Sequence, residues 1–293
     1  MTSPNKMSAK MKFNILLKTA AIFVCIAPIS PAFSQFAQVA DPLQYADLAD
    51  LAANSPVVIH AIVKEDIKVR PERATGLQTG FERHYIVAET RALIRGSGGA
   101  PKLIRYVIDM PLGSNGKTAK LKKLPVIIFA RQVNATSGDA QLSAPDAQIS
   151  WTSERDTKVR SIVRELVASD APPAISRITS AFHVPGTIIG EGETQVFMET
   201  KAGDPISITI ITRDQTKNWA VSLSEIVDQS ANAPPRNSLL WYRLACFLPK
   251  DLPISVIAAD READANQAKR DYVMVMQDLG ACPRARSASV RQP

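Results

Sequence analysis

Histidine is the side chain best suited to acid–base and metal chemistry near neutral pH, and the chain has three, His60, His84 and His183. His60 and His84 fall in neighbouring expected strands of one domain, whereas His183 falls in a second domain. The sequence contains no HExxH, HxH or HxxxH spacing, which would hold two imidazoles ready for a metal ion. A three-histidine site would require the two domains to close on each other, so we expect no metal site and no cofactor.

A serine hydrolase needs a serine on a sharp turn, a histidine base and an orienting carboxylate. The sequence has no GxSxG motif, and Ser97 and Ser114 lie in glycine-flanked segments that are typical of turns. Glu191 and Glu193 lie close together and could form an acid–base pair with His183 across a cleft. Their GEGE segment is also typical of a solvent-exposed hairpin, so a hydrolase with its site between the domains stays an alternative hypothesis.

A basic segment over 111–123, PLGSNGKTAKLKK, is the clearest charged feature, with lysines at Lys117, Lys120, Lys122 and Lys123. A basic loop on a small β-barrel could contact an anionic oligomer, which keeps oligosaccharide or nucleic-acid binding as a second alternative. Proteins that bind single strands also stack bases on aromatic rings. Aromatic residues make up only 6% of the chain, so we expect no nucleic-acid partner.

The three cysteines are Cys25, Cys246 and Cys282. Cys25 lies in an N-terminal segment that we expect to be removed, which leaves one intramolecular pairing in an oxidising compartment. We therefore predict a disulfide between Cys246 and Cys282, which would stabilise the fold by roughly 3–4 kcal/mol in the chain-entropy model. The absence of a CxxC motif, and of a histidine near either cysteine, argues against a redox or catalytic thiol.

Residues 1–34 have the pattern of a signal peptide, with four lysines and no acidic residue. The apolar run over 19–29 is too short to cross a hydrocarbon core, which needs about 20 helical residues. Ala32 and Ser34 supply the small residues that a signal peptidase requires, which predicts cleavage between Ser34 and Gln35. We expect an exported protein, periplasmic or secreted, without a transmembrane span in its mature chain; an uncleaved membrane anchor is the alternative.

The net charge of +7 is concentrated at the two ends of the chain. Residues 1–34 carry four of these charges, and the segment 283–293 carries three more on its arginines. The residues between them have no net charge, so the overall charge does not indicate a nucleic-acid-binding face. The segment 283–293 is basic and poor in apolar residues, and we expect a disordered tail there.

The first domain is expected over residues 42–151. A short helix over 42–54 precedes a change to period-two alternation at Val57. Five short strands separated by turns are typical of a small antiparallel barrel or sandwich. The expected strands begin at Val57 and then cover 86–94, 102–110, 126–133 and 140–150.

Three of these segments also occur in the order found in a known family: a long first strand (VVIHAIVKEDIKV), a second ending in ETRALIRG, and a later PVIIFAR. In this respect residues 55–133 resemble netrin-like modules, and the resemblance implies an OB-type five-stranded barrel. Secreted members of that family are rich in cysteine, and its metalloproteinase inhibitors bind zinc through an N-terminal cysteine. No cysteine occurs between Cys25 and Cys246, so only the barrel shape is carried over. The rest of the chain resembles no family of known function.

The second domain is expected over 152–282. The segment 153–169 places apolar residues at i, i+3, i+4, i+7 and i+8, which predicts an amphipathic helix with Ser153 and Asp156 at its start. Four strands follow, and a helix on a four-stranded antiparallel meander is an α+β domain. The expected strands cover 175–184, 194–200, 205–212 and 218–226.

Two helices are expected at the end of this domain. The first is a short apolar helix after Pro235 that stops at Pro249, and the second covers 260–279. Gly280 suits the C-terminal cap of the second helix. Cys246 and Cys282 lie near the ends of these helices, so the predicted disulfide would join them into a hairpin.

Together these patterns predict an exported, β-rich α+β protein with two domains. No catalytic constellation stands out in the sequence, which favours a non-catalytic binding or interaction protein. Its partner would be another protein of the cell envelope, contacted through a strand edge or the basic loop.

Overall fold

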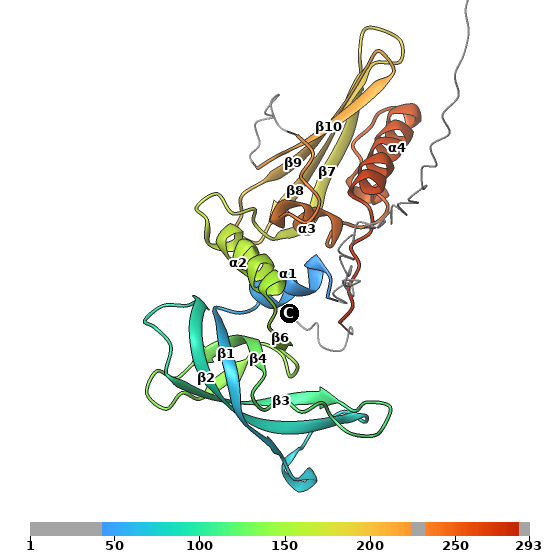
Figure 1. The fold of residues 1–293 in the computed structure, drawn as a ribbon. Coiled ribbons are helices and arrows are strands. Elements are labelled where there is room, and N and C mark those ends of the chain that lie inside the picture. The colour runs from blue at the N-terminus through green and yellow to red at the C-terminus, as the bar shows by residue number, and fades with distance from the viewer. Residues whose placement is uncertain (1–42, 224–231, 287–293) are drawn as a thin grey trace, which may run out of the picture. The chain divides into compact units, whose positions relative to one another are not determined.

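The computed structural model describes residues 43–223 and 232–286, and the statements below concern those residues. They form two antiparallel β-sheets, with α-helices before the first sheet, between the two and after the second (Figure 1). This arrangement confirms the predicted β-rich α+β class. The expected signal peptide, with its cleavage between Ser34 and Gln35, lies outside the described residues.

The first sheet contains β1 (Val57–Lys68), β2 (Phe81–Arg95), β3 (Leu103–Pro111), β4 (Pro125–Val133), β5 (Ala140–Leu142) and β6 (Gln148–Ser150). Its strand order is β3-β2-β1-β4-β5, and β6 also pairs with β4. Ile59, Ala61 and Val63 of β1 are buried in the core, which matches the predicted alternation. The same period-two pattern buries Ile86 of β2 and Ile104 of β3.

The two edges of this sheet approach each other without closing into a barrel. The amide of Arg105 in β3 donates to the carbonyl of Gly138 (2.8 Å), and the amide of Asp109 donates to the carbonyl of Pro145 (2.8 Å). Arg105 and Asp139 form only an isolated bridge, and no ladder joins β3 to β5 among the described residues. The antiparallel sheet is therefore as predicted, but a closed barrel is not found.

Gly138 makes the approach of these two edges sterically allowed. Its φ is +75°, a conformation that residues with a Cβ rarely adopt. A Cβ at this position would lie 2.2 Å from the carbonyl oxygen of Leu103 in β3. A side chain here would push the turn away from β3.

Helix α1 (Tyr45–Ala53) precedes the first sheet in the sequence and helix α2 (Ser153–Val167) follows it, and the two helices contact each other. The amphipathic helix predicted from residue 153 is confirmed, and Val159, Ile162 and Val163 form its buried stripe. Its N-cap is Thr152, whose hydroxyl accepts a hydrogen bond from the Arg155 amide (3.2 Å). The cap therefore lies one residue before the expected start, because Thr152 still has an extended backbone.

The second sheet contains β7 (Ile175–Pro185), β8 (Gly192–Thr200), β9 (Ile206–Arg213) and β10 (Thr216–Ser222). Its order, β10-β9-β8-β7, is the predicted antiparallel meander. Helix α4 (Glu262–Leu279) contacts β7 and β8 (Figure 1). Ala268, Tyr272 and Leu279 on the expected apolar face of this helix are buried.

The predicted disulfide between Cys246 and Cys282 is present, with the two Cα atoms 5.2 Å apart. Cys246 is the C-cap of α3 (Leu239–Ala245), and Cys282 follows the cap of α4, so the bond joins the ends of these helices. Arg284 and Arg286, at the start of the segment expected to be a disordered tail, form ion pairs with Asp50 and Asp146, whereas residues 287–293 lie outside the described residues. No helix within 43–223 and 232–286 is long and apolar enough to cross a membrane.

Gly138→Ala tests the approach of the two sheet edges. We expect it to lower the free energy of unfolding by about 2–4 kcal/mol, because it adds a steric clash to an unfavourable φ. Gly116→Ala is the matched control, since Gly116 has φ +69° and a Cβ there would meet nothing within 4 Å. The control should lose only about 1 kcal/mol in urea unfolding. Equal losses in the two variants would show that the Leu103 contact is unimportant.

Candidate functional site

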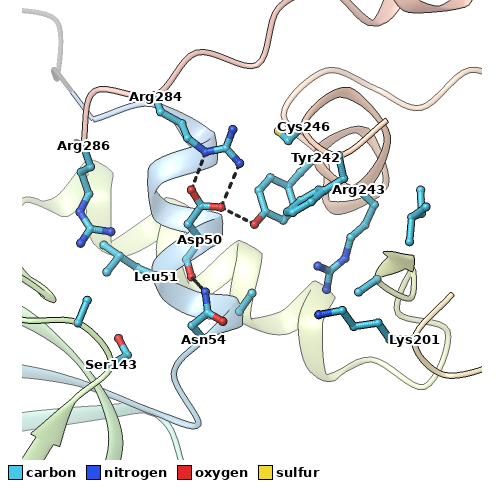
Figure 2. A pocket seen from close by; sticks show the side chains of 15 residues that line it. Asp50, Leu51, Asn54, Ser143, Lys201, Tyr242, Arg243, Cys246, Arg284 and Arg286 are labelled. Atoms are coloured by element: carbon cyan, nitrogen blue, oxygen red, sulfur yellow. Dashed lines mark hydrogen bonds and ion pairs between the residues drawn. The ribbon is translucent and has the colours of Figure 1, made fainter. Parts of the chain in front are cut away.

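A pocket of about 400 Å³ lies where α1, α3 and the C-terminal segment meet (Figure 2). The loop at Ser143 and the turn at Lys201 complete its wall. Residues far apart in the sequence thus line one cavity, within the size range of small-molecule sites. Its charged lining residues are Asp50, Lys201, Arg243, Arg284 and Arg286.

Asp50 of α1 is the acceptor at the centre of one wall. Its carboxylate accepts two hydrogen bonds from the guanidinium of Arg284 (2.7 and 3.2 Å) and one from the Tyr242 hydroxyl (2.6 Å) (Figure 2). Burial raises the pKa of Tyr242, and the neighbouring Asp50 carboxylate raises it further. Tyr242 therefore stays protonated and donates to Asp50. The Asp50 carboxylate also neutralises the Arg284 guanidinium, so this cation is not available to a ligand.

Arg286 on the same wall is neutralised as well. Its guanidinium pairs with Asp146, and its backbone amide donates to Asp47 (3.0 Å). Asp47 is 1% exposed and also accepts from the amides of Ala285 (2.9 Å) and Gln44 (2.9 Å). Hydrogen bonds of this kind are what a buried carboxylate needs.

Arg243 of α3 lies on the opposite wall and has no carboxylate partner among the described residues. Its Nε donates a long hydrogen bond to the Pro172 carbonyl (3.4 Å), and its guanidinium carbon lies 5.6 Å from the centre of the Tyr242 ring. Burial lowers the pKa of the Arg243 guanidinium, but an arginine remains cationic near neutral pH. The pocket therefore contains a partly buried positive charge without a counter-charge.

Lys201, in the turn between β8 and β9, adds a second cation to this wall. Its backbone amide donates to the Ala174 carbonyl (2.8 Å), which fixes the turn against the start of β7. No carboxylate within the described chain pairs with its ammonium group. Arg243 and Lys201 both extend into the pocket (Figure 2).

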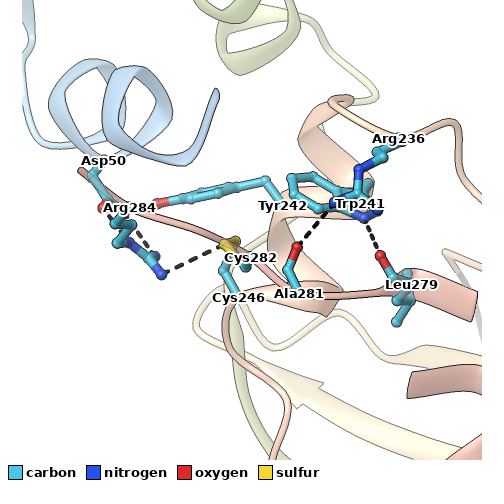
Figure 3. The surroundings of a disulfide bond; sticks show 9 residues. All are labelled: Asp50, Arg236, Trp241, Tyr242, Cys246, Leu279, Ala281, Cys282 and Arg284. Atoms are coloured by element: carbon cyan, nitrogen blue, oxygen red, sulfur yellow. Dashed lines mark hydrogen bonds and ion pairs between the residues drawn. A yellow bond between two sulfur atoms is a disulfide. The ribbon is translucent and has the colours of Figure 1, made fainter. Parts of the chain in front are cut away.

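The disulfide fixes the C-terminal segment at the edge of the pocket (Figure 3). Cys246 itself lines the cavity, and Arg284 Nη1 lies 3.5 Å from the Cys282 sulfur. Trp241 donates from its ring nitrogen to the Leu279 carbonyl (2.8 Å), which holds α3 against the end of α4. The disulfide is thus a structural bond that positions one wall of the site.

The basic loop predicted as an anion contact lies elsewhere in the protein. Lys117, Lys120, Lys122 and Lys123 are all exposed and do not line the pocket. The Leu121 amide donates to Asp66 of β1 (3.0 Å), which fixes the middle of this loop. The loop is therefore an ordered basic surface beside the first sheet.

His183 of β7 belongs to a buried network on the second sheet. Its Nδ1 lies 2.9 Å from the Thr194 hydroxyl, which donates to Asp271 of α4 (2.5 Å), and Lys217 also pairs with Asp271. Thr194 is 0% exposed, so no substrate reaches this hydroxyl. The network therefore anchors α4 to the sheet.

Glu191 and Glu193 do not join His183 in a common site. Glu191 accepts from the Asp214 amide (3.4 Å), and Glu193 accepts from the Gln195 side chain (2.6 Å). The acid–base arrangement across a cleft is not assembled among the described residues.

The other two histidines have separate surroundings. His60 stacks on Trp151, with ring centres 4.9 Å apart. His84 lies between Asp66 and Thr118, at the base of the basic loop. No group of three or more metal-binding side chains suited to a metal ion occurs within 43–223 and 232–286.

Sequence patterns missed the pocket residues, although one signal was available. Arg243 lies in an otherwise apolar helix, LLWYRLA, where a cation is unusual. Asp50 and Arg284 are separated by most of the chain, and no spacing rule relates them.

No protein-family model matches the sequence, and no curated protein matches it.

The buried His183 predicts a loss of stability on mild acidification. Burial lowers its pKa below the ordinary value near 6.5, and the Asp271 carboxylate only partly opposes this. The unfolded chain therefore binds a proton more readily than the folded one, so the free energy of unfolding falls as the pH drops below that value.

His183→Asn removes the titrating ring and keeps a donor near the Nδ1 position. We expect its free energy of unfolding to vary less between about pH 7.5 and about pH 5.5 than that of the wild type. Urea unfolding at several pH values measures this slope. His60 also has a pKa lowered by burial, so part of the slope should remain. An unchanged slope would remove His183 from the explanation.

Proposed function

We propose that the protein is a non-catalytic binding protein whose pocket holds a small anionic ligand. The observation that carries the proposal is Arg243, a partly buried guanidinium in the pocket wall without a carboxylate partner in the described chain. A charge removed from water is costly unless an opposite charge or hydrogen-bond acceptors compensate for it. A ligand anion would supply that compensation.

The ligand class follows from the geometry of the two cations. A guanidinium presents parallel N–H donors that match the two oxygens of a carboxylate or phosphate group. Lys201 adds a point charge on the same wall. The cavity of about 400 Å³ suits a small organic acid or phosphate ester.

The lining residues favour binding over catalysis. The Ser143 hydroxyl accepts from Ser55 (2.8 Å) and lies 3.3 Å from the Phe129 carbonyl, to which it donates. Cys246 is part of a disulfide, so its sulfur is no nucleophile. No histidine lines this pocket.

The same proposal includes export and an OB-type first domain. A disulfide in a protein of this size is typical of an oxidising compartment, which supports the signal peptide expected over 1–34. The strand order of the first sheet, with β3 returning to the residues beside β5, supports the resemblance of 55–133 to the barrel of netrin-like modules. A small anionic solute or an acidic group on an envelope protein would then be the ligand.

Calorimetric titration with inorganic phosphate and with succinate tests the pocket. We expect Arg243→Gln to raise the dissociation constant of the bound anion at least roughly tenfold, because a charge-assisted hydrogen bond contributes about 1.5–3 kcal/mol. Lys201→Gln should have a smaller effect, since Lys201 is an exposed residue whereas Arg243 is partly buried.

Lys250→Gln is the matched control, because Lys250 is an exposed lysine outside the pocket. It removes the same charge as Lys201→Gln and should leave the affinity unchanged. Equal weakening in all three variants would indicate a general effect of net charge and overturn the proposal. Absence of binding of both anions to the wild type would overturn it as well.

A further inference from the structure

The pocket at Arg243 has an apolar component that its charged groups do not explain. Phe247, just beyond the end of α3, lines the cavity and is 49% exposed. A large apolar side chain that faces a concave site, instead of the core, is placed to contact a ligand. Phe247 therefore carries information about the ligand that the two cations alone do not give.

Arg243 and Phe247 both pack on the same tyrosine ring. The guanidinium carbon of Arg243 lies 5.6 Å from the centre of the Tyr242 ring, and the centre of the Phe247 ring lies 5.2 Å from it at an interplanar angle of 88°. Tyr242 is 2% exposed, and its hydroxyl donates to Asp50 (2.6 Å), so its position is fixed. Because the cation and the phenyl ring share this contact, one small molecule can reach both.

Other apolar side chains continue the lining of the cavity. Ala53 of α1, Ala144 of the loop at Ser143, and Ala174 and Ile175 at the start of β7 also face it. None of these side chains has a polar atom that could donate or accept a hydrogen bond. The part of a ligand that they contact is therefore apolar.

The pairing of the other cations limits how many anionic groups a ligand can have. Arg284 and Arg286 line the pocket, but Asp50 and Asp146 already neutralise them. Only Arg243 and Lys201 remain without a carboxylate among the lining residues, and they serve one anionic group together. A second anionic group would lose its hydration against the apolar lining without gaining an unpaired cation.

We propose that the ligand is an organic acid with a single carboxylate on an apolar body, and that Phe247 determines the specificity for that body. This inference rests on the proposed anion site and narrows its ligand class. Arg243 binds the carboxylate, with Lys201 adding charge, while the Phe247 ring contacts the hydrocarbon. Medium-chain and aryl carboxylates have this structure, and the cavity of about 400 Å³ is large enough for them.

The affinity of such a ligand should rise with the length of its hydrocarbon chain. Burial of one methylene group contributes about a fourfold gain in affinity when the group is removed completely from water. Acetate and hexanoate have the same carboxylate and differ by four methylene groups. We expect hexanoate to bind at least about tenfold more tightly than acetate, even if burial of the chain is incomplete.

NMR titration of the isotope-labelled, disulfide-bonded protein with acetate and with hexanoate tests the inference, because it measures dissociation constants into the millimolar range. The ionic strength is held constant so that screening of the cations does not change. Equal affinity for the two carboxylates would overturn the inference and leave the anion site intact. Absence of binding of either carboxylate would overturn the anion site as well.

Variants of Phe247 separate contact with the ligand from a structural role. Phe247→Ala should reduce the ratio of hexanoate to acetate affinity by about fivefold or more and leave the acetate affinity unchanged. Phe247→Leu should keep most of the ratio, since it preserves an apolar side chain. Ile254→Ala is the control, because Ile254 is 76% exposed and lies outside the pocket, and it should change neither affinity.

Arg243→Gln distinguishes this inference from the proposed function. It should weaken acetate and hexanoate by the same factor, because it removes the contact to the carboxylate that both ligands share. Hexanoate binding that Arg243→Gln leaves unchanged would show apolar binding without the cation and would overturn both proposals. A loss of acetate affinity in Phe247→Ala as large as the loss of hexanoate affinity would show that Phe247 only supports the pocket wall, and would overturn its role in specificity.

Discussion

The constraint on which the described structure depends is the pairing of two aspartates of α1 with the C-terminal segment. Asp47 accepts the backbone amides of Ala285 and Arg286, and Asp50 accepts the Arg284 side chain. Asp47 is buried, so its charge is tolerated only while these donors are in place. The first helix and the last described residues therefore fold as one unit.

The pocket is a consequence of that pairing. The C-terminal segment supplies one wall, and it is fixed at one end by the Cys282 disulfide and along its length by α1. Arg284 and Arg286 reach the cavity already neutralised by Asp50 and Asp146. The cations left for a ligand come from α3 and the β8–β9 turn, which belong to the other half of the chain. A site assembled in this way exists only in the complete fold.

Local patterns in the sequence predicted the elements well and their long-range contacts poorly. Period-two alternation identified β1 because Ile59, Ala61 and Val63 face a core on one side of the strand. Cysteine counting identified the disulfide because only one pairing was left once Cys25 was assigned to the signal peptide. The first inference needs only residues that are neighbours in the sequence, and the second needs only a small number of possible cysteine pairings.

Contacts between side chains that are distant in the sequence escaped prediction for one physical reason. Thr118 and His84 are brought together by strand register and by a loop that Asp66 fastens, and neither effect leaves a spacing in the sequence. The tail arginines looked like free charge because composition does not record that Asp50 and Asp146 lie opposite them. Arg243 looked like one more cation in a chain of balanced charge. Net charge sums over pairs that cancel, whereas binding depends on the few charges that stay unpaired. For this protein the informative quantity is therefore the pairing of each cation that lines the pocket, and among those cations it singles out Arg243 and Lys201.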